Sequence, residues 1–227
     1  MRTRVKHFWS SEIGLSALLV ALVLTVFVLR PLTDLGLAGG RLIEAAFSLV
    51  LLLGGWSVWG GRARMVLVCI GVGGAGALRW MHWLTGSERL APWAALASAL
   101  TICIFIMLVL VLVFQPGPVT GRRIQGAIVA YLLFALAWAQ FYECVETFAP
   151  GAFTFSGGGG TATGWFSPLL YFSFITLTTL GYGDILPAHP AARSLATMEA
   201  LIGQLYPAIL IGRLVSLHAS GTDTAAD

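Results

Sequence analysis

The seven residues from Thr178 to Asp184, Thr-Thr-Leu-Gly-Tyr-Gly-Asp, have the composition of a segment that binds cations through its backbone. Glycines stand at alternate positions, Gly181 and Gly183, where they allow backbone conformations that other residues resist. Successive carbonyl oxygens can then face one side, and a ring of such strands can replace the water around an ion. The residues from Thr179 to Gly183 extend over at most about 17 Å, which is enough for several ion sites in series.

The expected ion ligands are four consecutive carbonyl oxygens with one hydroxyl group beneath them. The carbonyls belong to Thr179, Leu180, Gly181 and Tyr182, and the hydroxyl belongs to the side chain of Thr179. Gly183 completes the segment. The alternative is an ordinary glycine-rich turn, because a Gly-x-Gly pair alone is a weak motif.

This segment resembles the selectivity filter of potassium channels, with Thr178 and Asp184 as supporting residues at its two ends. The resemblance implies K⁺ at the carbonyls of residues 179–182 and no organic cofactor. Members of the family usually have valine where this chain has Leu180, which affects the packing behind the filter and leaves its backbone ligands unchanged. The intact Gly-Tyr-Gly triplet favours potassium over sodium, although some channels with this triplet pass both ions.

A short helix is predicted directly before the filter segment. Ser167 would be its N-cap, Pro168 its first helical residue, and the apolar run from Leu169 to Leu177 its body. About ten residues are too few to cross a bilayer. Non-helical backbone at membrane depth is tolerated where it is buried or lines a water-filled cavity, so the sequence predicts a re-entrant pore helix followed by the filter.

The family resemblance also gives roles to side chains of this short helix. Tyr171 and Phe172 stand where relatives have aromatic residues that pack against the filter tyrosine, which implies an aromatic cuff with Tyr182. Many relatives carry an acid near the position of Ile175, and it pairs with the aspartate after the filter. Ile175 has no such group, so the partner of Asp184 stays open at this point.

The composition is that of an integral membrane protein, because 58% of the 227 residues are hydrophobic and only 10% are charged. Six apolar stretches, most of them long enough to cross the bilayer, predict six helices: Ile13–Leu29, Leu42–Val58, Met65–Leu84, Trp93–Phe114, Ile124–Phe141 and Leu195–Val215. We therefore expect an all-α membrane protein of six transmembrane helices with a re-entrant pore helix and a filter loop. The first stretch could instead be a signal peptide, but its length and the even number of spans favour retention.

Basic residues indicate the orientation, since short cytoplasmic loops are enriched in Lys and Arg. One side carries Arg2, Arg4, Lys6, Arg62, Arg64, Arg122, Arg123 and Arg213, and the other carries Arg30, Arg41, Arg89 and Arg193. We expect a multi-pass protein of the bacterial inner or plasma membrane with both termini in the cytoplasm. The loop 146–190, which contains the filter, is then external. The net charge of +3 fits contact with anionic membrane lipids, and no basic aromatic patch suggests nucleic acid.

The chain is predicted to divide at the helix-breaking residues 117–121. Residues 122–217 would form the pore domain, composed of an outer helix, the pore helix, the filter and an inner helix. Residues 1–116 would form a four-helix unit, and residues 218–227 a short cytoplasmic tail. No cytoplasmic ligand-binding domain is expected within this chain.

The arrangement resembles the six-helix channels of the voltage-gated-like cation channel superfamily, with the strongest match from Tyr171 to Ser216. A voltage-sensing fourth helix carries arginines at every third position, but the stretch from Trp93 to Phe114 has none. We therefore expect a sensor-like unit without gating charges and no strong voltage gating. Arg79, inside the third stretch, is interpreted as an interfacial anchor rather than a gating charge.

Three acids and a glycine–proline pair complete the candidate residues. Glu199 lies within the last span and is expected behind the filter, bonded to groups of the pore loop. Pro207 cannot donate a hydrogen bond to the carbonyl of Gly203, so these two residues form a candidate gating hinge, with a static kink as the alternative. Glu143 and Glu146, near the outer mouth, are interpreted as solvated surface acids.

The sequence offers no enzyme chemistry, because no nucleophile and base are paired and the four histidines lack ligand spacing. Its three cysteines form no disulfide framework. The leading hypothesis is a homotetrameric potassium channel that conducts passively, since one chain carries one filter strand and four are needed. The alternatives are a non-conducting channel-like sensor or regulatory subunit and, less well matched, a potassium transporter subunit.

Overall fold

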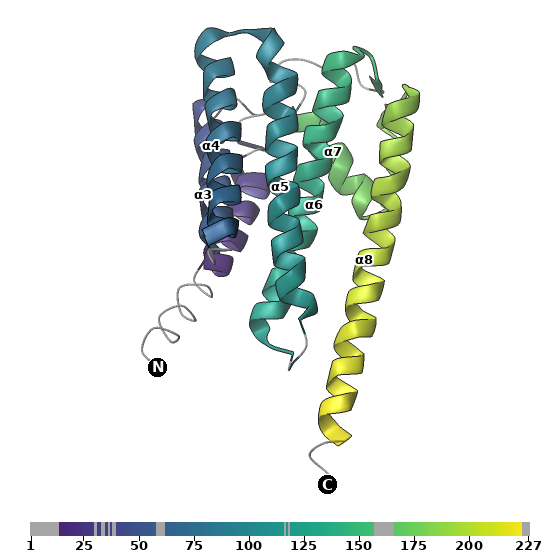
Figure 1. Cartoon of the computed structure of the whole chain (residues 1–227). Coiled ribbons are helices and arrows are strands. Elements are labelled where there is room, and N and C mark those ends of the chain that lie inside the picture. The colour runs from purple at the N-terminus through teal and green to yellow at the C-terminus, as the bar shows by residue number, and fades with distance from the viewer. Residues whose placement is uncertain are drawn as a thin grey trace.

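The fold is a bundle of long helices, as a computed structural model of the chain shows (Figure 1). The structure describes residues 14–29, 31–32, 35, 37, 40–57, 62–115, 117, 119–156 and 166–223. Residues 14–23 form an α-helix that continues into the π-helix η1 (Leu24–Leu29). The further elements are α3 (Gly40–Ser57), α4 (Arg62–Thr85), the 3-10 helix η2 (Glu88–Leu90), α5 (Ala91–Phe114), α6 (Gly121–Phe148), β1 (Phe153–Phe155), α7 (Phe166–Leu177), β2 (Ile185–Pro187) and α8 (Pro190–Asp223).

Among the residues that the structure describes, three helices are long and apolar enough to cross a membrane by length and composition: α5, α6 and the segment Pro190–Arg213 of α8. Shorter apolar helices cover Gly14–Leu29, Ala45–Gly55 and Val66–His82, within the first three predicted stretches. Together these segments make the chain a membrane protein. That all six cross the bilayer stays a prediction.

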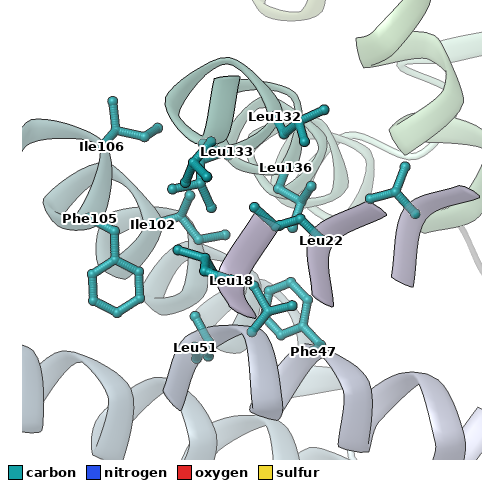
Figure 2. Close-up of a cluster of buried hydrophobic side chains, with 14 of the residues drawn as sticks. Leu18, Leu22, Phe47, Leu51, Ile102, Phe105, Ile106, Leu132, Leu133 and Leu136 are labelled. Atoms are coloured by element: carbon teal, nitrogen blue, oxygen red, sulfur yellow. The ribbon is translucent and has the colours of Figure 1, made fainter. Parts of the chain in front are cut away.

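One apolar core joins the first helix, α3, α5 and α6. In Figure 2 side chains from these four helices point toward one another, among them Leu18, Leu22, Phe47, Leu51, Ile102, Phe105, Leu133 and Leu136. Each of these eight side chains is at most 2% exposed. The helices before residue 116 therefore share an apolar core with the outer helix α6 of their own chain, and α5 makes the main contact with α6.

Helices α5 and α6 form a close antiparallel pair, because only residues 115–120 connect them. Gly126 of α6 permits this approach, since a Cβ at that position would lie 3.1 Å from Val113 and 3.5 Å from Val109 of α5. A side chain larger than hydrogen would push the two helices apart. The fourth helix is thus held directly against the outer helix.

Arg79 of α4 does not simply reach toward an interface. Its guanidinium carbon lies 4.3 Å from the centroid of the Phe47 ring on α3. That ring is only 2% exposed, so the cation rests on a buried aromatic face. This contact joins α4 to α3 inside the bundle. The role of Arg79 as an interfacial anchor stays a prediction.

The second half of the chain positions the filter segment. The short helix α7 lies beside α6 and α8, and α8 extends well beyond the other helices at its C-terminal end (Figure 1). Strands β1 and β2 pair antiparallel with Phe153 opposite Pro187, Thr154 opposite Leu186 and Phe155 opposite Ile185. This small sheet, which the sequence did not predict, ties the segment after α6 to the segment after the filter.

Two predicted boundaries were wrong. Helix α7 begins at Phe166, so Ser167 lies inside its first turn and is not the N-cap, while Pro168 remains in the first turn where its missing N–H costs nothing. Helix α8 begins at Pro190 and ends at Asp223, so the predicted tail 218–227 is helical as far as residue 223.

Candidate functional site

The filter segment has the alternating backbone that a row of aligned carbonyls requires. The φ angles of Thr179, Gly181 and Gly183 are 59°, 57° and 78°, so every second residue is left-handed. An ordinary strand has negative φ throughout. Glycine explains two of these positions, because it has no Cβ that resists positive φ. Thr179 is the exception, and it is the only non-glycine residue with positive φ in the part of the chain that the structure describes.

Backbone hydrogen bonds fasten the filter segment to the end of α7. The Thr178 amide donates a 3.0 Å hydrogen bond to the Phe174 carbonyl, and the Thr179 amide donates one of 3.0 Å to the Thr176 carbonyl. The amides of Leu180 and Gly181 both donate to the Ile175 carbonyl, at 2.8 Å and 3.2 Å. The side chain of Ile175 is buried, so this residue supports the filter through its carbonyl and not through an acid.

Glu199 of α8 lies directly behind this region, fully buried between α6 and α7. Its carboxyl group accepts hydrogen bonds from the hydroxyls of Tyr142 on α6 and Ser173 on α7. The Ser173 hydroxyl also lies 2.8 Å from the Ala135 carbonyl oxygen of α6. One acidic side chain therefore links the inner, outer and pore helices, and each of its two carboxyl oxygens has a hydroxyl donor that satisfies it.

The two pore-helix aromatics have different surroundings. Tyr171 interacts through its hydroxyl with the Asp184 carboxyl and lies near Tyr182. Phe172 packs instead against Tyr142 and Phe153, with ring centroids 5.2 Å and 5.4 Å apart. Within one copy of the chain the Phe172 ring fills the apolar cluster between α6 and β1, and the aromatic cuff with Tyr182 stays a prediction. The Asp184 carboxyl accepts a 3.1 Å hydrogen bond from the Ile185 amide and interacts electrostatically with Tyr171, two contacts that sequence reasoning missed.

The outer mouth is braced by an acid that was expected to be solvated. Glu146 is only 3% exposed. Its two carboxylate oxygens accept hydrogen bonds from the amides of Gly151 at 2.8 Å and Phe153 at 3.1 Å. The interpretation as a surface acid was wrong, because the turn after α6 folds back over the carboxylate. Directly after β1, the Ser156 amide donates a 2.9 Å hydrogen bond to the Asp184 carbonyl, so the segment that contains β1 also contacts the end of the filter segment.

Gly203 has a packing reason to be glycine. It is buried on α8, and a Cβ built there would overlap the Leu177 carbonyl oxygen and lie 2.8 Å from its carbonyl carbon. The inner helix thus touches the base of the filter through bare backbone. Helix α8 continues through Pro207 without interruption. A hinge at these two residues stays a prediction.

The described residues contain no group of three or more His, Cys, Asp or Glu side chains that could hold a metal ion. Cys69, Cys103 and Cys144 are free thiols in this structure.

Comparison with known proteins supports this interpretation for part of the chain. Residues 127–219 match a family described as "Ion channel". The chain is 41% identical over 84 residues to "Two pore potassium channel c" of Oryza sativa subsp. japonica, which covers 37% of this chain and 18% of that protein. It is 36% identical over 89 residues to "Inward rectifier potassium channel Kirbac3.1" of Paramagnetospirillum magnetotacticum, covering 39% of this chain and 26% of that protein.

"Protein LctB" of Bacillus caldotenax is 32% identical over 87 residues, which are 37% of this chain and 64% of that protein. The chain thus spans less than a third of the length of the first two relatives and under two thirds of the third. No solved structure matches the chain. These findings agree with the expectation that the protein is not an enzyme. The segment 127–219, which holds α7, the filter segment and most of α6 and α8, matches the ion-channel family, and potassium channels are among the proteins that this part of the chain resembles.

Proposed function

We propose that four copies of this chain form a potassium-selective channel that conducts K⁺ passively across a cell membrane. The observation that carries the proposal is the left-handed conformation of Thr179, Gly181 and Gly183, at alternate positions of a Gly-Tyr-Gly filter sequence. K⁺ would be held by the carbonyls of residues 179–182 and by the Thr179 hydroxyl. The ion is the transported substrate, and its sites lie in series, which permits conduction by displacement of one ion by the next.

The surfaces left uncovered in a single chain support assembly around the filter. Leu180 and Tyr182 are 58% and 69% exposed, although they lie at the centre of the pore region. The span of α8 is only 17% buried in one copy, compared with 67% for α6. In the assembly, further copies of the chain would cover part of this apolar face of the inner helix, and the rest of the face would line a central cavity. A fourfold arrangement supplies the four filter strands that a ring of carbonyls needs.

The helices before residue 116 would form a sensor-like unit that does not respond strongly to voltage. Helix α5 contains no charged residue, so it has nothing for a membrane field to move. Only the short connection 115–120 joins this helix to α6, on which it packs closely. We propose six membrane spans with both termini in the cytoplasm, an external filter exit, and anionic lipids around the cytoplasmic arginines.

The test is K⁺ flux into liposomes that contain the purified protein, with Na⁺ flux measured in parallel. We expect K⁺ uptake that a membrane potential drives and that greatly exceeds Na⁺ uptake. Leu180→Val is the matched control, because only the carbonyl of this residue is expected to face the ion. A tetramer that passes no ions would instead favour a non-conducting regulatory subunit, and a stable monomer would contradict the fourfold pore.

A further inference from the structure

The end of α7 presents four carbonyl groups that the helix itself cannot satisfy, because the last turn of any helix lacks the following amides. Three of them, at residues 174–176, accept the amides of the filter segment. The fourth belongs to Leu177, the residue immediately before the filter. It accepts a hydrogen bond of 3.1 Å from the hydroxyl of Tyr131 on α6. Leu177 is fully buried, so water cannot take the place of this donor.

This hydrogen bond lies two residues from the strained position of the filter. Thr179 has a φ of 59°, a left-handed conformation that is strained for a residue with a Cβ. Such conformations persist only where the surrounding structure over-determines them. The carbonyl of Leu177 and the amide of Thr178 belong to the same peptide plane. Anchoring the Leu177 oxygen therefore restricts the backbone from which Thr179 departs.

The ring of Tyr131 is itself held by the inner helix. It stacks on Tyr206 of α8 with the ring centroids 6.0 Å apart and an angle of 19° between the planes. Tyr206 is fixed in turn by the edge of Phe134, at 5.5 Å, and by a 2.9 Å hydrogen bond from its hydroxyl to the Ala127 carbonyl. One turn earlier on α8, Gly203 touches Leu177 directly. The inner helix thus reaches the base of the filter both directly and through Tyr131.

We propose that Tyr131 is a positioning residue of the filter, whose hydroxyl fixes the Leu177 carbonyl and whose stack on Tyr206 makes that bond sensitive to the position of α8. This inference rests on the proposed function, because it assigns a role within the same ion pathway. Its consequence is that ion preference depends on a hydroxyl that never touches the ion. Displacement of α8 at Tyr206 would alter K⁺ binding before any change at the cytoplasmic end of the pore.

The chain offers a matched pair of variants for the test. Tyr131→Phe removes the hydroxyl that holds Leu177, and Tyr206→Phe removes the hydroxyl that holds Ala127. Both variants keep the aromatic stack and lose one hydrogen bond to a backbone carbonyl. The protein is studied as the full chain, by the K⁺ dependence of its thermal unfolding, which reports ion affinity by linkage, and by the ratio of K⁺ to Na⁺ flux in liposomes.

We expect Tyr131→Phe to weaken apparent K⁺ affinity, or K⁺ preference over Na⁺, by about tenfold, the equivalent of 1.4 kcal/mol. Tyr206→Phe should change either quantity by less than about twofold, since its hydroxyl does not contact the filter base. A third variant, Tyr206→Leu, removes the stack and leaves the Tyr131 hydroxyl. It should shift K⁺ affinity in the same direction as Tyr131→Phe and by a smaller factor.

Each result separates the inference from the function beneath it. Suppose that the wild-type protein responds to K⁺, but that Tyr131→Phe has the K⁺ affinity and preference of wild type or of Tyr206→Phe. This result overturns the role of Tyr131 and leaves the proposed function in place. A wild-type response to K⁺ that Tyr206→Leu leaves unchanged overturns the link to α8. A wild-type protein whose unfolding and flux ignore K⁺ overturns the proposed function, and the inference with it.

Discussion

Replacement of Gly203 by alanine tests whether this glycine serves packing or bending. A Cβ at position 203 would lie 2.8 Å from the Leu177 carbonyl carbon and 3.1 Å from its Cα, whereas ordinary contacts begin at 3.4 Å. The neighbouring atoms are backbone atoms at the end of α7, so no side chain can rotate out of the way. Either α8 must move outward or the base of the filter must shift.

Two opposing terms set the magnitude. Alanine in place of glycine favours a helix by about 1 kcal/mol. Overpacking of a close contact costs about 1–3 kcal/mol, and rigid backbone on one side places this case in the upper part of that range. The packing term wins, so we expect Gly203→Ala to destabilise the folded protein by about 1–2 kcal/mol per chain. A flexible hinge that had no packing role would show the opposite sign.

Gly212→Ala on the same helix is the matched control, because a Cβ there has no neighbour within 4 Å. This variant should be as stable as wild type or more so, by up to about 1 kcal/mol. The assay is thermal or denaturant unfolding of the purified assembly in detergent and lipid, compared between the two variants at fixed K⁺ concentration. If Gly203→Ala proved as stable as Gly212→Ala, the close contact with Leu177 would not be what requires glycine at this position.

Three further predictions concern the filter, the outer mouth and the first helices. Gly181→Ala should abolish K⁺-selective flux while the assembly persists, because nothing lies within 4 Å of the added Cβ and the only penalty is the φ of 57°; unchanged flux and selectivity would refute the assignment of the filter. Glu146→Ala leaves the buried amide of Phe153 without an acceptor, at about 1–3 kcal/mol, and also removes the acceptor of the amide of Gly151, an exposed residue of the turn. Faster hydrogen exchange at Gly151 and Phe153 should follow, with Glu146→Gln intermediate, and equal exchange in all three proteins would contradict the bracing role. Because α5 carries no charge, open probability should vary little between about −100 and +100 mV, where each moved charge gains about 2.3 kcal/mol per 100 mV; steep activation in planar bilayers would disprove this.

The sequence alone determined the features that depend on residue type and on short-range pattern. Apolar stretches of membrane-spanning length predicted where the helices lie, because hydrocarbon excludes charges and demands that backbone groups be satisfied within each segment. Gly181 and Gly183 indicated positive φ, and both angles are positive in the structure. Short-range signals therefore predicted the helix before the filter segment to within two residues of the observed start of α7, while the assignment of the segment as a filter stays a prediction.

Tertiary structure decided which groups meet, since these contacts join residues far apart in the chain. Thr179 carries no sequence signal for a left-handed conformation; the hydrogen bonds around it impose one. Glu146 resembled a surface acid until the following turn brought two amides to its carboxylate. Gly203 suggested flexibility, and the packed structure adds a close contact with Leu177 that leaves no space for a Cβ. Burial and hydrogen-bond partners depend on how the helices pack. A local sequence pattern can therefore indicate candidate residues, but their roles follow only from the contacts that they make in the folded protein.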